Sequence, residues 1–326
     1  MAGQQLPPGQ IDAQPTKTFF VDMLVRDIPL EQAVLDLVDN SVDGAKFMHN
    51  ASDRFDGRQI KLTVNSDEFI IWDNCGGFSI EAARDYAFRF GRKIGTPKTP
   101  HSIGQFGVGM KRALFKFGEH FVVRSATEDE VWAIDVDVAI WEADEKNWHF
   151  PWSEFKESEL STSLPGTEII VDRLRPEVSA RFGTQHFVNT IIGLVKSKHR
   201  QFILSGLSIS INGTHLDATN LCLAMTDKLS PGVDILSFET EGEDSVDVRI
   251  VVGVGTSSPR EAGWYVICNG RVILEADRRS VTGWGVLEEE AGRTLIPSYH
   301  NQFSRFRGIV SFDSSDSSRI PWNTTK

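Results

Sequence analysis

Between residues 30 and 46, apolar and small side chains recur at steps of three and four. These positions are Leu30, Val34, Leu37, Ser41 and Ala45. The spacing predicts an amphipathic helix whose apolar face turns towards a core. A second face of the helix would carry Asp36, Asn40 and Asp43 at the same spacing. Taken alone, this polar face fits a solvated helix surface better than a ligand site.

An alternating pattern follows and predicts two strands, over residues 59–64 and 68–72, joined by a hairpin turn at 65–67. Asp73 comes at the end of the second strand, and two glycines follow shortly after it. Such a carboxylate suits the close approach of a flat ligand to the backbone, because glycine adds no side chain. A plain turn is the competing interpretation.

A glycine-rich stretch precedes the helical pattern of residues 110–117. Its Gly104, Gly107 and Gly109 would let backbone N–H groups approach phosphate oxygens, and the start of a helix adds a partial positive charge. The stretch differs from a dinucleotide fingerprint, which follows the first strand, and from a P-loop, because it ends in Gly-Met-Lys. Lys111 lies in the first helical turn, from where it could reach a phosphate or point to solvent.

The residues just before this stretch predict a helix and then a loop. Apolar positions favour a helix over residues 80–90. Residues 91–103 contain two glycines, two prolines and four basic or histidine residues. Their place beside the glycine-rich stretch favours a mobile loop over an anionic ligand, although an ordinary solvated loop has the same composition.

The rest of the chain combines alternating strands with one long helical pattern. Residues 141–164 are irregular and rich in tryptophan and charge. A helix is expected over residues 179–204, beyond a boundary at 175/176. Strands are expected at residues 120–126, 131–138, 168–172, 207–211, 246–254 and 263–267.

Length and composition suit a globular protein of two domains. The chain has 326 residues, of which 40% are hydrophobic. A formal net charge of -11 argues against a broadly basic nucleic-acid surface but leaves room for a local basic groove. The three cysteines form no disulfide framework, and the sequence shows neither a signal pattern nor an apolar run of membrane length. We therefore expect a soluble, cytoplasmic protein.

Four short boxes follow one another along the chain: Leu30–Lys46, Ile71–Phe78, Gly104–Lys111 and Gly166–Thr167. In this order and at these distances they resemble the GHKL ATPases. That superfamily includes type II topoisomerase ATPase subunits, ninety-kilodalton heat-shock chaperones, MutL-type repair proteins, microrchidia proteins and sensor histidine kinases. The similarity covers residues 25–172 well and the rest more weakly, and the glycine box is most similar to that of microrchidia and heat-shock-chaperone members.

The resemblance implies an α+β fold in two parts. Residues 18–175 would form a Bergerat-type ATP-binding sandwich, with helices over a mixed, mostly antiparallel sheet, after a flexible arm at residues 1–17. Residues 176–326 would form an S5-like transducer domain, and Cys268–Leu274 resembles the Asn-Gly-Arg strand of MutL-like second domains. Ile320–Lys326 resembles the segment that carries a lysine to the γ-phosphate, which suggests a piece of a longer protein.

The same resemblance assigns residues to nucleotide binding. Asp73 would accept a hydrogen bond from the adenine amino group, with Gly77 against the base and the Thr167 hydroxyl in support. Cys75 stands where the family pattern has its first glycine, and its small side chain makes this change tolerable. Asp43 would have a structural role on the adenine side. The phosphate side would be lined by Gly104, Gln105, Phe106, Gly107, Val108, Gly109 and Lys111.

The polar face of the first helix would hold the catalytic groups. Asn40 would give an oxygen to Mg²⁺, which prefers oxygen ligands and keeps several waters. Asp36, one turn earlier, would be the general base, where most hydrolytic members have glutamate. Lys326 would stabilise the charge that develops on the γ-phosphate. The expected cofactors are therefore ATP and Mg²⁺.

Three function classes stay open at this point. The first is an ATP hydrolase that forms a homodimer when ATP binds and acts on DNA or a protein partner. The second is a nucleotide-gated clamp with little turnover, which the short Asp36 side chain would allow. The third is histidine-kinase phosphotransfer, which fits least because the residues before the first box contain no histidine. No membrane association is expected.

Overall fold

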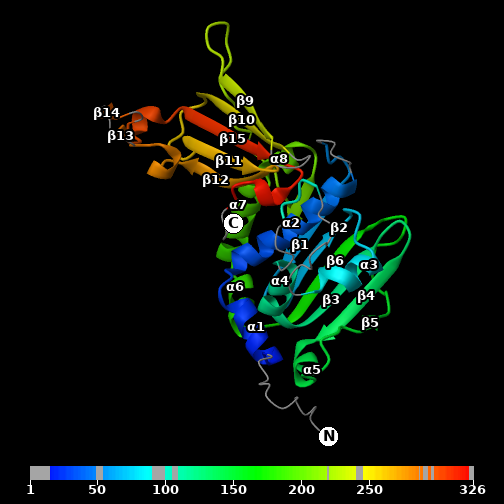
Figure 1. Ribbon diagram of the computed structural model, residues 1–326. Coiled ribbons are helices and arrows are strands. Elements are labelled where there is room, and N and C mark those ends of the chain that lie inside the picture. Colours follow the sequence, from blue (N-terminus) through cyan, green and yellow to red (C-terminus); the bar gives the residue numbers. More distant parts are fainter. Residues whose placement is uncertain are drawn as a thin grey trace, which may run out of the picture.

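A computed structural model of the chain describes residues 15–48, 54–89, 100–104, 109–218, 220–239, 245–285, 287–288, 293–294 and 297–322. These residues form an α+β fold with an eight-stranded sheet, a five-stranded sheet and a layer of helices (Figure 1). Both sheets contain parallel as well as antiparallel pairs, so the expected fold class is confirmed. Within the described ranges, no helix has both the length and the apolar character that a membrane crossing requires.

The first sheet is built around the predicted hairpin. β1 (Gln59–Val64) and β2 (Phe69–Asp73) pair antiparallel. The sheet continues from β2 through β6 (Gly166–Leu174), β3 (Gly118–Ala126), β4 (Val131–Asp137) and the short edge strand β5 (Trp152–Ser153). The alternation therefore predicted β1, β2, β3, β4 and β6, and their ends differ only slightly from the expected ones, but it did not predict β5, which lies in the region expected to be irregular.

Helices cover one face of this sheet. α2 (Leu30–Met48) packs against α4 (Gly109–Phe117), and α4 in turn contacts α1 (Lys17–Arg26), as Figure 1 shows. All five residues of the predicted apolar face of α2 are buried. Val34 and Leu37 join strand residues such as Ile60 and Phe121 in one continuous core. Because packing of an apolar face supplies most of a helix's stability, this core fixes the position of α2.

The segment expected as a helix at residues 80–90 is shorter and wider than predicted. It forms one turn, α3 (Ile80–Ala82), followed by a π-helix, η1 (Ala83–Ala87). The carbonyl oxygen of Ala87 accepts a hydrogen bond from the Lys111 ammonium at 2.7 Å, which satisfies the end of the helix. Phe90 lies outside the described residues.

The pattern at residues 179–204 forms three helices instead of one. They are α6 (Pro176–Phe182), α7 (Gln185–Lys198) and α8 (Arg200–Leu204). The hydroxyl of Thr184 accepts a hydrogen bond from the N–H of Phe187 and starts α7 as a new helix. A side-chain cap of this kind interrupts the helix but leaves the apolar spacing unchanged, so the periodicity alone did not predict the interruption.

Two further segments are more ordered than expected. α5 (Val138–Ala143), capped by Asp137, occupies the start of the region expected to be irregular. Lys17, expected at the end of a flexible arm, begins α1 and is buried. Its ammonium donates to the carbonyl oxygens of Trp141, Asp144 and Asn147, so it ties α1 to the end of α5.

The second sheet contains the strands of the C-terminal part. In spatial order they are β12 (Arg271–Asp277), β11 (Gly263–Cys268), β15 (Phe306–Asp313), β10 (Ser245–Val254) and β9 (Gly232–Glu239). β13 (Leu287–Glu288) and β14 (Arg293–Thr294) form a separate small hairpin. Short 3-10 helices lie at Ser280–Thr282, Asn301–Phe303 and Ser317–Arg319.

The division between the two sheets does not coincide with the boundary expected at 175/176. β7 (Ser208–Ile211) pairs in parallel with β1, and β8 (Thr214–His215) pairs with β7. The chain therefore stays in the first sheet as far as His215, and the second sheet begins at β9. The free backbone groups on the outer side of β1 require a partner, and a strand far along the chain supplies it.

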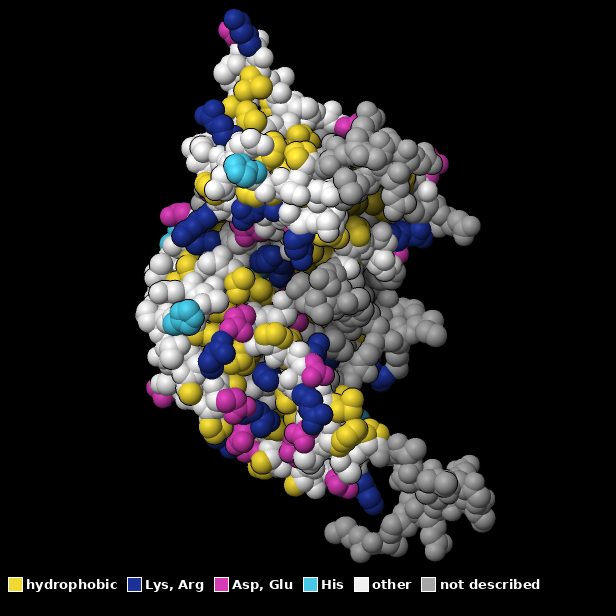
Figure 2. All heavy atoms as spheres, turned by 90° about the vertical axis from the view of Figure 1, so that its left-hand side faces the viewer, with side chains coloured by type: hydrophobic (Ala, Val, Ile, Leu, Met, Phe, Trp, Pro, Cys, Tyr) yellow, Lys and Arg dark blue, Asp and Glu magenta, His cyan; other side chains and the backbone are white. Residues whose placement is uncertain are grey.

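The second sheet packs on the helices of the first layer through β12, which contacts α7 and α8. Lys198 Nζ donates to the carbonyl oxygen of Ile273 at 2.9 Å, and Arg200 forms an ion pair with Glu275 at 2.9 Å. Figure 2 shows the side of the molecule that lies on the left in Figure 1, and Lys and Arg side chains are gathered across its middle. Polar contacts as well as apolar packing thus hold the two layers together.

Candidate functional site

The polar face of α2 lies against both described ends of the glycine-rich stretch. A Cβ placed on Gly104 would lie 3.3 Å from Oδ2 of Asp43 and 3.6 Å from Oδ1 of Asn40. A Cβ placed on Gly109 would lie 3.0 Å from Oδ2 of Asp36. The structure therefore brings these five predicted residues together. Gln105, Phe106, Gly107 and Val108 lie outside the described residues.

Asp43 holds the beginning of this stretch. Its carboxylate accepts hydrogen bonds from the backbone N–H of Ile103 at 2.8 and 3.0 Å and of Gly104 at 2.8 Å. Burial raises the pKa of Asp43, while nearby Lys46 and the two N–H groups oppose the rise. Asp43 thus contacts the backbone of the stretch, and its expected structural role on the adenine side stays a prediction.

Asn40 is more exposed than Asp36 and Asp43. Asn40 is exposed, so a ligand can approach its amide oxygen. Asp36 is half-buried, and its Oδ1 accepts a hydrogen bond from Gln32 Nε2 at 2.8 Å. The amide of Gln32, one turn earlier on α2, thereby orients the carboxylate. The two side chains offer oxygens one helical turn apart on the same face.

Asp73 is buried at the end of β2 and accepts three hydrogen bonds. Its Oδ2 accepts from the Ser41 hydroxyl at 2.6 Å, and its Oδ1 accepts from the backbone N–H of Cys75 at 2.9 Å and of Thr167 at 3.2 Å. Burial raises the pKa of Asp73, and the three donors oppose the rise. The contact from Thr167 comes from its backbone, and the expected support from its hydroxyl stays a prediction.

Ser41 is a site residue that the sequence reasoning did not identify. Its spacing correctly placed it on the buried face of α2, but its hydroxyl links that helix to Asp73. The available signal was a polar residue inside an otherwise apolar stripe. Because a buried hydroxyl without a partner is costly, a serine at such a position predicts a buried acceptor nearby.

Two glycines permit the close backbone packing around Asp73. Gly77 has a φ of +62°, and a Cβ there would lie 2.2 Å from the carbonyl oxygen of Ala126. A Cβ on Gly166 would lie 1.9 Å from the carbonyl oxygen of Asp73. A side chain at either position would separate strands that meet at the site. Cys75, in the place of the first family glycine, lies buried in the main core.

Lys111 does not point to solvent, so that alternative is wrong. Its side chain is buried, and its ammonium donates to Ala87 as described above. A contact between Lys111 and a phosphate stays a prediction. Residues 91–99 of the expected loop and the proposed catalytic Lys326 lie outside the described residues. Residues 100–103, at the end of that loop, are described and, with Gly104, contact α2 through Asp43 and Lys46.

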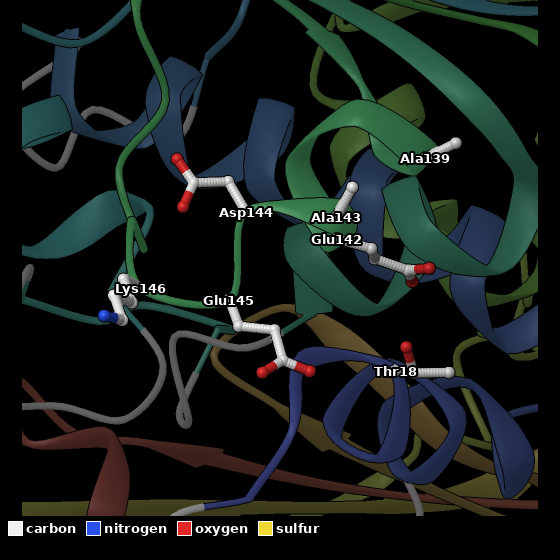
Figure 3. A pocket seen from close by; sticks show the side chains of 7 residues that line it. All are labelled: Thr18, Ala139, Glu142, Ala143, Asp144, Glu145 and Lys146. Atoms are coloured by element: carbon white, nitrogen blue, oxygen red, sulfur yellow. The ribbon is translucent and has the colours of Figure 1, made fainter. Parts of the chain in front are cut away.

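A separate open pocket of about 630 Å³ lies between α1 and the end of α5. Figure 3 shows its lining side chains, which include the carboxylates of Glu142, Asp144 and Glu145. Lys146 is the only cation among the lining residues in this described region. Three carboxylates around one ammonium repel an anionic ligand, so we do not assign a phosphate compound to this pocket.

Comparison with known families agrees with this geometry. Residues 28–167 match the family described as "Histidine kinase-, DNA gyrase B-, and HSP90-like ATPase". This part of the chain is therefore similar to GHKL-type ATPase domains. A domain of this class binds ATP, and the matched range contains the polar face of α2, Asp73, the glycine-rich stretch and Thr167. No curated protein matches the chain.

The side chains in the matched range could hold a hard cation such as Mg²⁺ only together with oxygens of a bound phosphate compound. Asn40 offers an exposed amide oxygen between the carboxylates of Asp36 and Asp43. Among the residues that the structure describes, no cluster of three or more His, Cys, Asp or Glu side chains could hold a metal ion by itself. A Mg²⁺ ion here would therefore take Asn40 together with phosphate oxygens and water, as this ion commonly does.

Proposed function

We propose that the GHKL-like domain binds ATP with Mg²⁺ at the polar face of α2 and hydrolyses it. The observation that carries the proposal is the double role of this helix. Its polar face lies against Gly104 and Gly109, and its Ser41 hydroxyl holds the buried carboxylate of Asp73. Asp73 would accept from the adenine amino group, and the glycine-rich stretch, apart from the Gly104 N–H that Asp43 holds, would donate its N–H groups to the phosphates. One helix thus connects both ends of the nucleotide.

In this proposal Asp36 is the general base. It lies one helical turn before Asn40 and next to Gly109, where α4 begins. Its carboxylate takes a proton from the attacking water as the water oxygen bonds to the γ-phosphorus and the bond to the bridging oxygen breaks. Gln32 holds the carboxylate in place during this transfer. Mg²⁺, when bound at Asn40, neutralises phosphate charge.

We extend the proposal to the second sheet, as an S5-like transducer domain of the MutL-like kind whose Lys326 reaches the nucleotide. Trp322 supports this extension because it packs both against the main core and against the cluster of Cys268, Ile273 and Ile320. Its Nε1 donates to the carbonyl oxygen of Ser317 at 2.7 Å. The chain therefore runs between the two layers shortly before Lys326. ATP binding would favour a homodimer that acts on DNA or a protein partner.

One observation favours a second candidate function, a nucleotide-gated clamp with little turnover. Asp36 is one methylene shorter than glutamate, and Gln32 already donates a hydrogen bond to it. Such a base removes protons slowly, so bound ATP would persist and hold the protein in its closed form.

A rate measurement on Asp36→Asn tests the proposed hydrolysis. We expect the variant to bind ATP about as well as the parent and to release phosphate about 10²–10⁴-fold more slowly under single-turnover conditions, as is typical for loss of a general base. Glu31→Gln is the matched control on the same helix, because the Glu31 carboxylate pairs with Arg181 instead of facing the site. An Asp36→Asn rate equal to that of the parent would exclude Asp36 as the base. ATP binding by a parent protein without phosphate release would favour the clamp.

A further inference from the structure

The turn between β11 and β12 of the second sheet contacts α2 of the first layer. It consists of Asn269 and Gly270, which both have positive φ, at +47° and +84°. Two residues of this conformation form the tight hairpin turn that an Asn-Gly pair favours. Asn269 and the following Arg271 are only 2% and 1% exposed. Buried polar residues need hydrogen-bond partners. The side-chain amide of Asn269 finds one of them in Ser314, directly after β15, whose backbone it bonds at 3.0 and 3.2 Å, and its other partner lies outside the second sheet.

Arg271 finds its partner on α2. Its Nε donates to Oδ1 of Asp39 at 2.9 Å, and its second guanidinium nitrogen donates to Oδ2 at 3.3 Å. His199, which follows α7, also donates to Oδ1 of Asp39 through Nε2 at 2.7 Å. Asp39 directly precedes Asn40 in the sequence. The second sheet is therefore bonded to the residue next to the proposed magnesium ligand.

Asn269 also bonds Lys46 of α2 and Ser102, which lies in the segment at residues 100–104. Its carbonyl oxygen accepts from the Lys46 ammonium at 2.6 Å, and Lys46 also donates to the carbonyl oxygen of His101 at 2.9 Å. Its side-chain amide donates to the carbonyl oxygen of Ser102 at 3.3 Å. Burial lowers the pKa of Lys46, whereas the charge of nearby Asp43 raises it. One lysine thus joins α2, the segment and the turn.

The strand-to-helix connection after β15 holds the same segment. The N–H of His101 donates to the carbonyl oxygen of Ser315 at 3.1 Å, and the hydroxyls of Ser102 and Ser317 are 3.3 Å apart. The other end of the segment, at Ile103 and Gly104, donates to Asp43 as described above. Five residues therefore connect the second sheet to the face of α2 that lies beneath the glycine-rich stretch.

We propose that the turn Asn269–Arg271 positions the nucleotide site and couples its occupancy to the placement of the second sheet. Arg271 holds α2 at Asp39, and Asn269 with Lys46 holds residues 100–104, whose last N–H groups bind Asp43. A bound nucleotide that moves Asn40 or Gly104 also moves the groups that the turn contacts, because Asp39 precedes Asn40 and residues 100–104 end at Gly104. Coupling between two sites is reciprocal, so a turn that keeps these contacts also favours the nucleotide-bound arrangement. These are positioning residues, and the inference rests on the proposed ATP site.

Lys46→Met and Asn269→Gly test the coupling. Methionine keeps the length of the lysine stem but loses both carbonyl contacts. Glycine keeps the positive φ of the turn but loses the side-chain amide, and with it the hydrogen bonds to Ser102 and to Ser314, so the coupling is supported only where both variants agree. Lys198→Met is the matched control, because the Lys198 ammonium likewise bonds a backbone carbonyl of the second sheet, that of Ile273, but does not bond residues 100–104. Amide hydrogen exchange in the β11–β12 hairpin is measured with and without a saturating non-hydrolysable ATP analogue.

In the parent and in Lys198→Met, we expect the analogue to slow exchange in the hairpin. In Lys46→Met and Asn269→Gly, we expect the analogue to bind about 5–150-fold more weakly, as for a typical coupling free energy, and to leave exchange in the hairpin unchanged when it saturates. A purely structural contact would raise exchange equally with and without the analogue. Protection equal to that of the parent in both variants would overturn the coupling alone, whereas a parent that does not bind the analogue would overturn the ATP site as well.

Discussion

Replacing Asp73 with asparagine should separate nucleotide recognition from folding. Asparagine has nearly the same shape, and its amide oxygen can still accept from the N–H groups of Cys75 and Thr167, which lie 2.9 and 3.2 Å from Oδ1. Its NH₂ group would face the Ser41 hydroxyl, and a hydroxyl can accept as well as donate. The three local hydrogen bonds can therefore persist in Asp73→Asn.

The expected magnitudes follow from charge and burial. Burial raises the pKa of Asp73, which shows that the charged form is held there at a cost. A neutral amide avoids that cost, so we expect the free energy of unfolding to change by no more than about 1 kcal/mol. A hydrogen bond to a charged group contributes about 1.5–3 kcal/mol, so loss of the acceptor for the adenine amino group should weaken ATP binding about 10- to 150-fold.

Calorimetric titration with ATP and Mg²⁺, together with chemical unfolding, measures both quantities on the same sample. Asp172→Asn serves as control, because Asp172 lies on the same strand as Thr167 but bonds His120 away from the site. An ATP affinity of Asp73→Asn equal to that of the control would refute the adenine contact. A large loss of stability would instead refute the argument that asparagine keeps the three hydrogen bonds.

Two further predictions concern the frame around the site. Burial lowers the pKa of His199 below its ordinary value, with Asp39 opposing the shift and Arg271 adding to it. The unfolded chain therefore binds a proton at His199 at a higher pH than the folded chain does, and the free energy of unfolding should fall as the pH drops below about 6.5. Denaturant titrations between pH 5 and 7 should show a flatter dependence of this free energy on pH for His199→Gln. Gly166→Ala should destabilise the domain by about 1–3 kcal/mol and weaken ATP binding, because the added Cβ would meet the Asp73 carbonyl oxygen at 1.9 Å; an unchanged melting temperature would contradict this packing argument.

The sequence was sufficient wherever the determining interactions are local. The three- and four-residue steps from Leu30 to Ala45 predicted both the helix and its buried face, because helical geometry relates positions a few residues apart. The alternation around the turn at residues 65–67 predicted the β1–β2 hairpin for the same reason. The order of the four boxes indicated a likeness to the GHKL class, and the match of residues 28–167 to a family of that class supports it.

Local patterns were insufficient where a cap or a wider turn changes the helix without changing its apolar spacing. Thr184 begins a new helix inside the 179–204 pattern, and the π-helix at Ala83–Ala87 ends where the Lys111 ammonium bonds the last carbonyl. The sequence left two alternatives for Lys111, a contact with a phosphate and a side chain exposed to solvent. Only the packed structure excluded the exposed side chain, because its hydrogen-bond partner, Ala87, lies 24 residues earlier.

Sequence by itself therefore determined α2, the β1–β2 hairpin and the chemical character of the expected site, but tertiary structure decided which distant residues share that site. Ser41 and Asp73 are 32 positions apart, and Asp39 and Arg271 are 232 positions apart. The placement of β7 beside β1, which moves the division between the sheets to beyond His215, likewise joins strands about 150 residues apart. Such pairs form because buried polar groups and strand edges must be satisfied by whatever the fold brings near, and no periodicity along the chain records that choice.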